Sequence, residues 1–237
     1  MRTGSAQPFP RSRHTPLVLL LGLAGAAWAV SIWQANTSRE MPMGPVFFLA
    51  TWATMMAAMM FPSAAPMVLT FRRLQAGRRQ LGSLTASTLA FVAGYLAVWT
   101  AFGVLALAAR TLLESAGLIL AGRTVTGGLL VVAGLYQLSP WKHACLSSCR
   151  TPLGFLLGSW RNGVGGAFQM GLQHGLYCLG CCWLLFALLL PLGLMNLAAM
   201  TVLTLLVSAE KLLPLGDRFA RAVGIGLAAA GLMLLAS

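Results

Sequence analysis

The sequence predicts an all-α protein, a polytopic bundle of about seven transmembrane helices. Three observations support this prediction. The 237 residues are 58% hydrophobic and only 8% charged, whereas a soluble domain carries roughly a quarter charged residues. Several apolar runs approach the roughly 20 residues that cross a bilayer as a helix. These runs are continuous and show no alternation of apolar and polar residues, which favours helices over a membrane β-barrel.

Seven apolar segments qualify as candidate spans. They cover residues 17–33, 46–70, 84–109, 117–138, 166–190, 194–213 and 219–236. The connections between them are short, and the sequence shows no fixed-period repeat or low-complexity tract. We therefore expect a single transmembrane domain over residues 1–237, in which residues 1–16 form a cytoplasmic tail.

Segments rich in basic residues alternate along the chain with segments that are poor in them. The rich segments carry Arg2, Arg11, Arg13, Arg72, Arg73, Arg78, Arg79, Lys142, Arg150, Arg161, Lys211, Arg218 and Arg221. The opposite segments carry only Arg39, Arg110 and Arg123. By the positive-inside rule, the N-terminus is cytoplasmic and the C-terminus lies outside. The net charge of +12 then reflects topology and contact with anionic membrane lipid, and no nucleic-acid partner is expected.

The first span has an alternative interpretation. Its basic start, its apolar stretch and the tripeptide Ala27-Trp28-Ala29 are also typical of a cleavable signal peptide. We favour a retained helix because the apolar run continues past this tripeptide to Trp33. The predicted orientation is the same in both cases.

The fifth span carries one histidine and three cysteines within GLQHGLYCLGCCW. At about 100° per residue, His174, Cys178, Cys181 and Cys182 share one arc of the helix. A single cysteine would be interpreted as a small packing residue. Thiolate and imidazole donors three and four residues apart, however, can converge on one ion, and soft donors select Cu(I) or Zn(II). An ionisable side chain at membrane depth also favours a functional role.

The second span carries four methionines within TWATMMAAMMFPSAAPM. Met55, Met56, Met59 and Met60 fall on one broad face of the predicted helix. Methionines at this spacing are often packing residues, but these lie at about the same membrane depth as the cysteines of the fifth span. Because Cu(I) accepts thioether sulfur and Zn(II) rarely does, copper is the favoured ion and zinc the less favoured one.

A GxxxG pair, Gly171 and Gly175, lies on the ligand side of the fifth span. Small residues at this spacing allow another helix to approach closely. We therefore expect the second and fifth spans to be direct neighbours. One of the four methionine sulfurs should then lie within about 6 Å of His174 or a fifth-span cysteine, near enough for a modest movement to close a metal site.

The basic segment KHACLSSCR is predicted as a cytoplasmic loop with a second soft-donor cluster, His143, Cys145 and Cys149. It adjoins the cytoplasmic end of the fifth span, where an ion could be loaded. The alternative is that these are ordinary loop thiols, since structural disulfides are rare in a reducing cytoplasm.

The ends of the sixth span carry residues whose roles the sequence specifies less closely. Glu210 and Lys211, at its cytoplasmic end, are expected to pair with each other. Met195, Asn196 and Met200, near its outer end, either form an exit site or pack.

Four motifs occur together in this chain. They are WxxMxxAMMxP from Trp52 to Pro62, YQLSPWKHACLSSCR, MGLQHGLYCLGCCW, and GLMNLAAM followed by EKLLP. Over about residues 45–215 this combination resembles a bacterial family of predicted metal-binding integral membrane proteins, associated with copper chaperones of polyphenol-oxidase-type enzymes. The one departure is that Ala198 or Ala199 stands where an aromatic residue is expected before Met200.

The resemblance implies copper handling in the bacterial cytoplasmic (inner) membrane. The positions that match the family motifs are Met55, Met59, Met60, His174, Cys178, Cys181 and Cys182. The implied partner is a copper-dependent enzyme that receives the ion.

The predicted function is therefore a non-enzymatic membrane copper chaperone. Cu(I) would be held between the second and fifth spans and passed to a copper enzyme or a soluble copper carrier. The sequence contains no nucleotide-binding loop, acyl-transfer triad or pair of catalytic carboxylates.

Two alternatives stay open. One is a membrane thiol–disulfide oxidoreductase that uses Cys178/Cys181 and Cys145/Cys149, although desolvation disfavours thiolate attack near the midplane. The other is a proton- or ion-coupled metal transporter, which is weakened because no Asp or Glu lies in the middle of a predicted span.

Overall fold

The computed structural model describes residues 15–37, 44–77, 84–117, 122–193 and 196–237, and this part of the chain contains helices and no strand. The all-α prediction is confirmed for these residues. The helices are α1 (Thr15–Thr37), α2 (Pro45–Gly77), α3 (Leu84–Ser115), α4 (Arg123–Gln137), α5 (Pro140–Arg150), α6 (Pro152–Gly158), α7 (Gly163–Ala187), α8 (Leu189–Leu192), α9 (Leu197–Leu212) and α10 (Gly216–Ala236). The predicted cytoplasmic tail lies outside the described residues, except for its last two, with which α1 begins.

Among the described residues, five segments are long and apolar enough to cross a membrane. They are Leu17–Thr37 in α1, Pro45–Gly77 in α2, Leu84–Leu113 in α3, Gly163–Leu192 in α7 and α8, and Gly216–Ala236 in α10. The fourth and sixth predicted spans correspond to α4 and α9, which have 15 and 16 residues and are shorter than the roughly 20 residues that a span needs. The membrane class is therefore supported, whereas the total of seven spans and the orientation of the termini stay predictions.

The helices α3 and α7 pack closely along much of their length. Glycine residues, which have no side chain, allow this close approach. A Cβ atom on Gly171 would overlap the carbonyl oxygen of Phe91, and one on Gly94 would overlap the carbonyl oxygen of Phe168. The predicted close approach at the GxxxG pair is confirmed, but α3 fills the notch rather than α2. The sequence could not select the partner because small residues permit close approach to any helix.

The long helix α2 packs against α1, α3 and α9. It continues through Pro62 and Pro66. The indole nitrogen of Trp52 donates a hydrogen bond of 2.9 Å to the carbonyl oxygen of Trp99 on α3, which satisfies a buried polar group. This contact fixes the rotation of α2 against α3, so that the methionine face of α2 points into the protein.

The segment KHACLSSCR (142–150) is predicted to be a loop, and this prediction is wrong because the segment belongs to the helix α5. Ser139 caps the helix by accepting a hydrogen bond of 3.2 Å from the backbone nitrogen of Lys142. Pro140 occupies the first turn, where proline is favoured because no backbone N–H is needed there. Since α5 packs against α7, the cysteines of α5 lie near those of α7.

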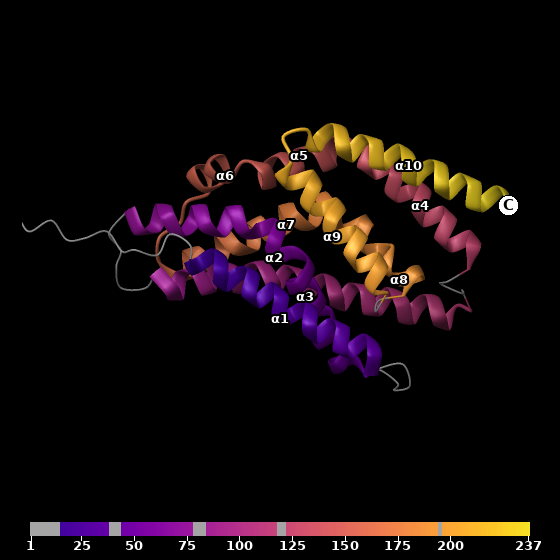
Figure 1. The fold of residues 1–237 in the computed structure, drawn as a ribbon, viewed down its shortest axis with the longest axis horizontal. Helices are drawn as coiled ribbons and strands as arrows, with labels where there is room; N and C mark the ends of the chain where they lie inside the picture. The colour runs from indigo at the N-terminus through magenta and orange to yellow at the C-terminus, as the bar shows by residue number, and fades with distance from the viewer. Residues whose placement is uncertain (1–14, 38–43, 78–83, 118–121, 194–195) are drawn as a thin grey trace, which may run out of the picture.

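Buried side chains form two clusters. The first is rich in sulfur and combines the methionines of α2 with the cysteines of α7. The second, called the aromatic cluster below, combines phenylalanines such as Phe71, Phe91 and Phe155 with aliphatic side chains, and it also contains Met67 of α2. In Figure 1, α4 and α10 run side by side along one edge of the bundle, while α7 lies centrally between α3 and α5. The sulfur-rich cluster therefore lies at the centre of the fold.

The glycine packing of α7 predicts that Gly171→Ala destabilises the protein, because the new Cβ atom would displace the α3 backbone. Overpacking of this kind typically costs about 1–3 kcal/mol, measurable as a lower unfolding temperature in detergent. Gly165→Ala on the same helix is the control, since its Cβ atom meets nothing within 4 Å. This control should be neutral or slightly more stable, because alanine is favoured over glycine in helices by up to about 1 kcal/mol. Equal unfolding temperatures for the two variants would contradict the packing.

Candidate metal centre

The three cysteines of α7 form a compact group of sulfur atoms. Cys178, Cys181 and Cys182 are at most 1% exposed, and their sulfur atoms all lie within 4.8 Å of one another. The thiols of Cys181 and Cys182 donate hydrogen bonds of 3.0 and 2.8 Å to the carbonyl oxygen of Cys178. All five cysteines of the chain are free. The prediction that the fifth-span cysteines share one face and converge is confirmed.

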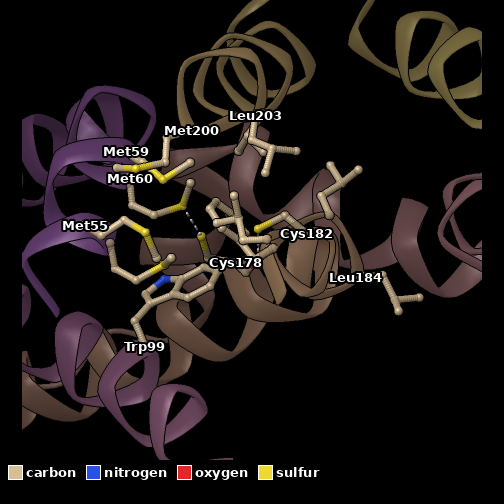
Figure 2. Close-up of a cluster of buried hydrophobic side chains, with 14 of the residues drawn as sticks. Met55, Met59, Met60, Trp99, Cys178, Cys182, Leu184, Met200 and Leu203 are labelled. Atoms are coloured by element: carbon tan, nitrogen blue, oxygen red, sulfur yellow. Dashed lines mark hydrogen bonds between the residues drawn. The ribbon is translucent and has the colours of Figure 1, made fainter. Parts of the chain in front are cut away.

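A methionine of α2 reaches this group. The sulfur of Met60 lies 3.9 Å from the sulfur of Cys178, within the predicted limit of about 6 Å. Figure 2 shows Met55, Met59, Met60 and Met200 on one side of Cys178, with the sulfur of Cys178 directed at Met60. The side chains of the second and fifth spans therefore meet, although the backbone of α7 packs closely against α3 instead.

The other predicted methionine ligands are buried in the same cluster. Met55, Met56 and Met59 are at most 1% exposed. Met200 of α9 is also fully buried and belongs to this cluster. The sulfur of Met60 contacts that of Cys178 directly. The rest surround that contact with soft, apolar side chains.

Two polar side chains that the sequence analysis did not assign to this site contact Cys178. The ammonium of Lys211 donates a hydrogen bond of 3.0 Å to its sulfur, and the hydroxyl of Tyr95 lies 3.0 Å from the same sulfur. Lys211 also donates to the hydroxyl of Ser63 at 3.3 Å. A sulfur that accepts a hydrogen bond from an ammonium group is well suited to carry negative charge as a thiolate. The thiolate is the form of cysteine that binds metals.

The expected pairing between Glu210 and Lys211 is wrong. The carboxylate of Glu210 accepts hydrogen bonds from Lys142 at 2.6 Å and from Gln137 at 2.8 Å. Adjacent residues of a helix point about 100° apart, so Glu210 faces α4 and α5 while Lys211 faces Cys178. No pattern in the sequence indicated the Lys142 contact, because Lys142 is predicted to lie in a loop.

His174, predicted as a ligand, lies outside the three-cysteine group. It is 3% exposed and is surrounded by aromatic rings, with centroid distances of 5.5 Å to Tyr95, 5.6 Å to Phe155 and 6.0 Å to Phe91. Its Nδ1 atom is buried without a hydrogen-bond partner among the described residues. His174 precedes Cys178 by one turn, or about 6 Å along the axis, so it lies beside the group rather than within it.

The predicted cluster of His143, Cys145 and Cys149 is divided in the structure. Hydrogen bonding with Cys178 and Cys181, together with burial, raises the pKa of the Cys149 thiol. Burial and the nearby Cys181 raise the pKa of the Cys145 thiol. The two α5 cysteines therefore extend the α7 group instead of forming a separate one.

His143 points elsewhere. Its Nδ1 atom lies 3.5 Å from one carboxylate oxygen of Asp217, whose other oxygen accepts from Arg150 at 2.9 Å. The spacing explains the division, because positions 145 and 149 share a helix face that position 143 does not.

The predicted exit-site residues at the start of α9 have separate roles. Asn196 is exposed and caps α9 by accepting a hydrogen bond of 3.1 Å from the backbone nitrogen of Ala199. Met200 packs in the sulfur-rich cluster. Met195 lies outside the described residues.

The fold and this centre define a helical membrane protein with a buried, sulfur-rich group that is arranged to hold a metal ion. A family model described as a copper chaperone, PpoB2, matches residues 49–234. The chain therefore belongs to the PpoB2 copper chaperone family, and its three-cysteine group, which could hold a metal ion, is consistent with a copper-handling role. The resemblance drawn from the sequence motifs is confirmed. Neither the curated proteins nor the solved structures contain a match.

The buried Lys142–Glu210 pair predicts a large loss of stability when one partner is removed. Both side chains are at most 1% exposed, so Glu210→Gln leaves the charge of Lys142 buried and uncompensated, which typically costs about 3–5 kcal/mol. Asp217→Asn is the control, because Asp217 is half exposed and exposed pairs contribute about 1 kcal/mol or less. Unfolding in detergent measures both variants.

The double variant Lys142→Met/Glu210→Leu removes both charges and should recover much of the lost stability. Glu210→Gln unfolding at the temperature of the Asp217→Asn control would show that the buried pair does not hold α5 in place.

Proposed function

We propose that this protein holds Cu(I) between α2 and α7 and delivers it to a copper-dependent enzyme. In this proposal Cys178 is the central ligand, Met60 binds from the opposite helix, and Cys181 and Cys182 supply further thiolates. The observation that carries the proposal is the 3.9 Å distance between the sulfurs of Met60 and Cys178, in a chain of the copper chaperone family.

The sulfur spacing suits a metal ion shared by the two helices. With metal–sulfur bonds of about 2.3 Å, two sulfurs lie about 3.8 Å apart at a tetrahedral angle and about 4.0 Å apart at a trigonal angle. The Met60–Cys178 distance of 3.9 Å fits both geometries, so the type of ligand rather than the spacing selects the ion. A thioether in the ligand set favours Cu(I) over Zn(II). Met55, Met56, Met59 and His174 are secondary candidates that would need to move to reach the ion.

The two α5 cysteines are proposed to load the ion. Cys149 lies against Cys178 and Cys181, and α5 belongs to the side predicted to be cytoplasmic by the distribution of basic residues. Copper could therefore pass from Cys145 or Cys149 to Cys178 by exchange of one thiolate for another. His143 is the less favoured loading residue, because it faces Asp217.

The recipient and the membrane are proposed from the family and the topology. The family's description as a copper chaperone implies a copper-dependent enzyme as partner. The helices that are long enough to span a bilayer, together with the positive-inside pattern, support the bacterial inner membrane as the location.

One observation favours a second candidate, a thiol–disulfide oxidoreductase. The contact of Cys149 with Cys178 and Cys181 would allow a thiolate to attack a disulfide across the α5–α7 interface. Such an enzyme would not need Met60, whereas a copper site would. Copper binding by methionine variants therefore separates the two functions.

The copper proposal predicts that Met60→Leu loses most of the copper that the reduced wild-type protein retains against a Cu(I) chelator. Leucine deletes the thioether at nearly constant volume and typically costs less than about 1.5 kcal/mol of stability. Met67→Leu is the matched control, because Met67 is equally buried on the same helix but packs in the aromatic cluster. Cys178→Ser should also lose copper, since a hydroxyl is a poor donor to Cu(I).

Metal analysis of the purified variants, with Zn(II) as competitor, measures this effect. Full copper retention by Met60→Leu, combined with a mixed disulfide trapped by Cys178→Ser, would replace the copper proposal with the oxidoreductase.

The loading proposal predicts a kinetic effect of Cys149→Ser. Transfer of Cu(I) from a glutathione complex to the purified protein should slow by about tenfold or more, because the first thiolate for exchange is missing. The amount of copper retained at equilibrium should fall less than in Cys178→Ser. Ser147→Ala, an exposed change on the same helix, serves as control. An unchanged transfer rate in Cys149→Ser would exclude this cysteine from loading.

A further inference from the structure

Lys211 places a fixed positive charge beside the proposed copper ligands. The side chain comes from the last turn of α9 and is 8% exposed. Its ammonium lies 3.0 Å from the sulfur of Cys178 on α7 and 3.3 Å from the hydroxyl of Ser63 on α2. Ser63 in turn donates to the carbonyl oxygen of Met60 at 3.0 Å. The charge is thus held in the same space between α2 and α7 in which Met60 and Cys178 meet.

No carboxylate neutralises this charge within the described part of the chain. The nearest acid in sequence, Glu210, is occupied by Lys142 at 2.6 Å and by Gln137 at 2.8 Å. The other acid with described contacts, Asp217, binds Arg150 and His143. The acidic group that Lys211 contacts directly is the thiol of Cys178, so in this inference thiolates, the same groups that would bind the metal, balance its charge.

A fixed cation next to a metal site discriminates between ions by their charge. The repulsion between Lys211 and the bound ion is proportional to the charge of the ion, so for the same ligands a divalent ion is repelled twice as strongly as a monovalent one. The buried surroundings of Lys211, Cys178 and Ser63 weaken solvent screening, which increases this difference.

We propose that Lys211 is the specificity-determining residue of the centre. Its positive charge makes the centre accept monovalent soft ions such as Cu(I) and reject divalent soft ions such as Zn(II). This inference rests on the proposed copper site. It adds a source of selectivity that does not depend on the chemical identity of the ligands, because Zn(II) binds thiolates well.

The test compares three ions on variants of the full-length protein purified in detergent. Lys211→Gln and Lys211→Leu remove the charge, and Lys211→Arg keeps it. Lys211→Leu is included because an apolar replacement of a buried charge needs no polar partner, so this variant is expected to fold if Lys211→Gln does not. Binding of Cu(I), Ag(I) and Zn(II) is measured by competition with chelators of known affinity.

The neutral variants should shift the ratio of Zn(II) to Cu(I) affinity towards zinc by at least about tenfold relative to wild type. Lys211→Arg should keep the wild-type ratio. The ratio of Ag(I) to Cu(I) affinity should stay within about twofold in all variants, because both ions carry one charge. A general distortion of the site would change this second ratio as well, so the pair of ratios separates charge selection from a structural effect.

Three results would overturn the inference. The first is a zinc-to-copper ratio that does not change in a folded neutral variant while wild type retains copper. The second is a folded neutral variant that loses all three ions, which would make Lys211 a residue that holds the site together. The third is a wild-type protein that retains no copper, and this result alone would also remove the proposed function.

Discussion

The close packing of α3 on α7 determines the surroundings of Cys178, on which the remaining features of the centre depend. Because Gly94 and Gly171 allow the two backbones to approach, the hydroxyl of Tyr95 on α3 comes within 3.0 Å of the Cys178 sulfur. The opposite side of this sulfur is then open to α2 and α9, which contribute Met60 and Lys211. Four helices therefore meet at one atom, and a movement of any of them would change its partners.

Charged residues are scarce in this chain, and two adjacent ones have different roles. One forms a buried ion pair between helices, and the other contacts the sulfur atoms of the centre. Only four acids are present in 237 residues. Glu210 binds Lys142 and thereby joins α9 to α5, whereas Lys211, the next residue, is directed at the sulfur atoms. Since a buried charge is expensive in a membrane protein, an unbalanced lysine at this position is informative. Its contact with Cys178 at 3.0 Å is the observation on which the proposed selection of ions by charge rests.

This arrangement fits a protein that has to bind an ion and release it again. Thiolates bind soft ions strongly, whereas thioethers are neutral and bind more weakly, so a mixed set gives intermediate affinity and favours ligand exchange. The contact of Cys149 with the α7 cysteines extends the sulfur donors towards α5. The methionines of α2 add further soft donors on one side of Cys178 (Figure 2). A continuous series of soft donors through the core is consistent with the copper-handling role of the family.

The sequence by itself determined the helical membrane class, the shared face of Cys178, Cys181 and Cys182, and the inward methionine face of α2, because hydropathy and helical periodicity are local properties of a segment. It also carried the motifs that assign the family. Only the tertiary structure decided that α3 fills the GxxxG notch, that α5 is a helix bringing Cys149 to the centre, and that Lys211 binds Cys178 rather than Glu210. These features depend on the rotation and tilt of whole helices relative to one another. Such rotations are set by the fit of side chains that are far apart in the chain, and no local pattern in a single sequence specifies them.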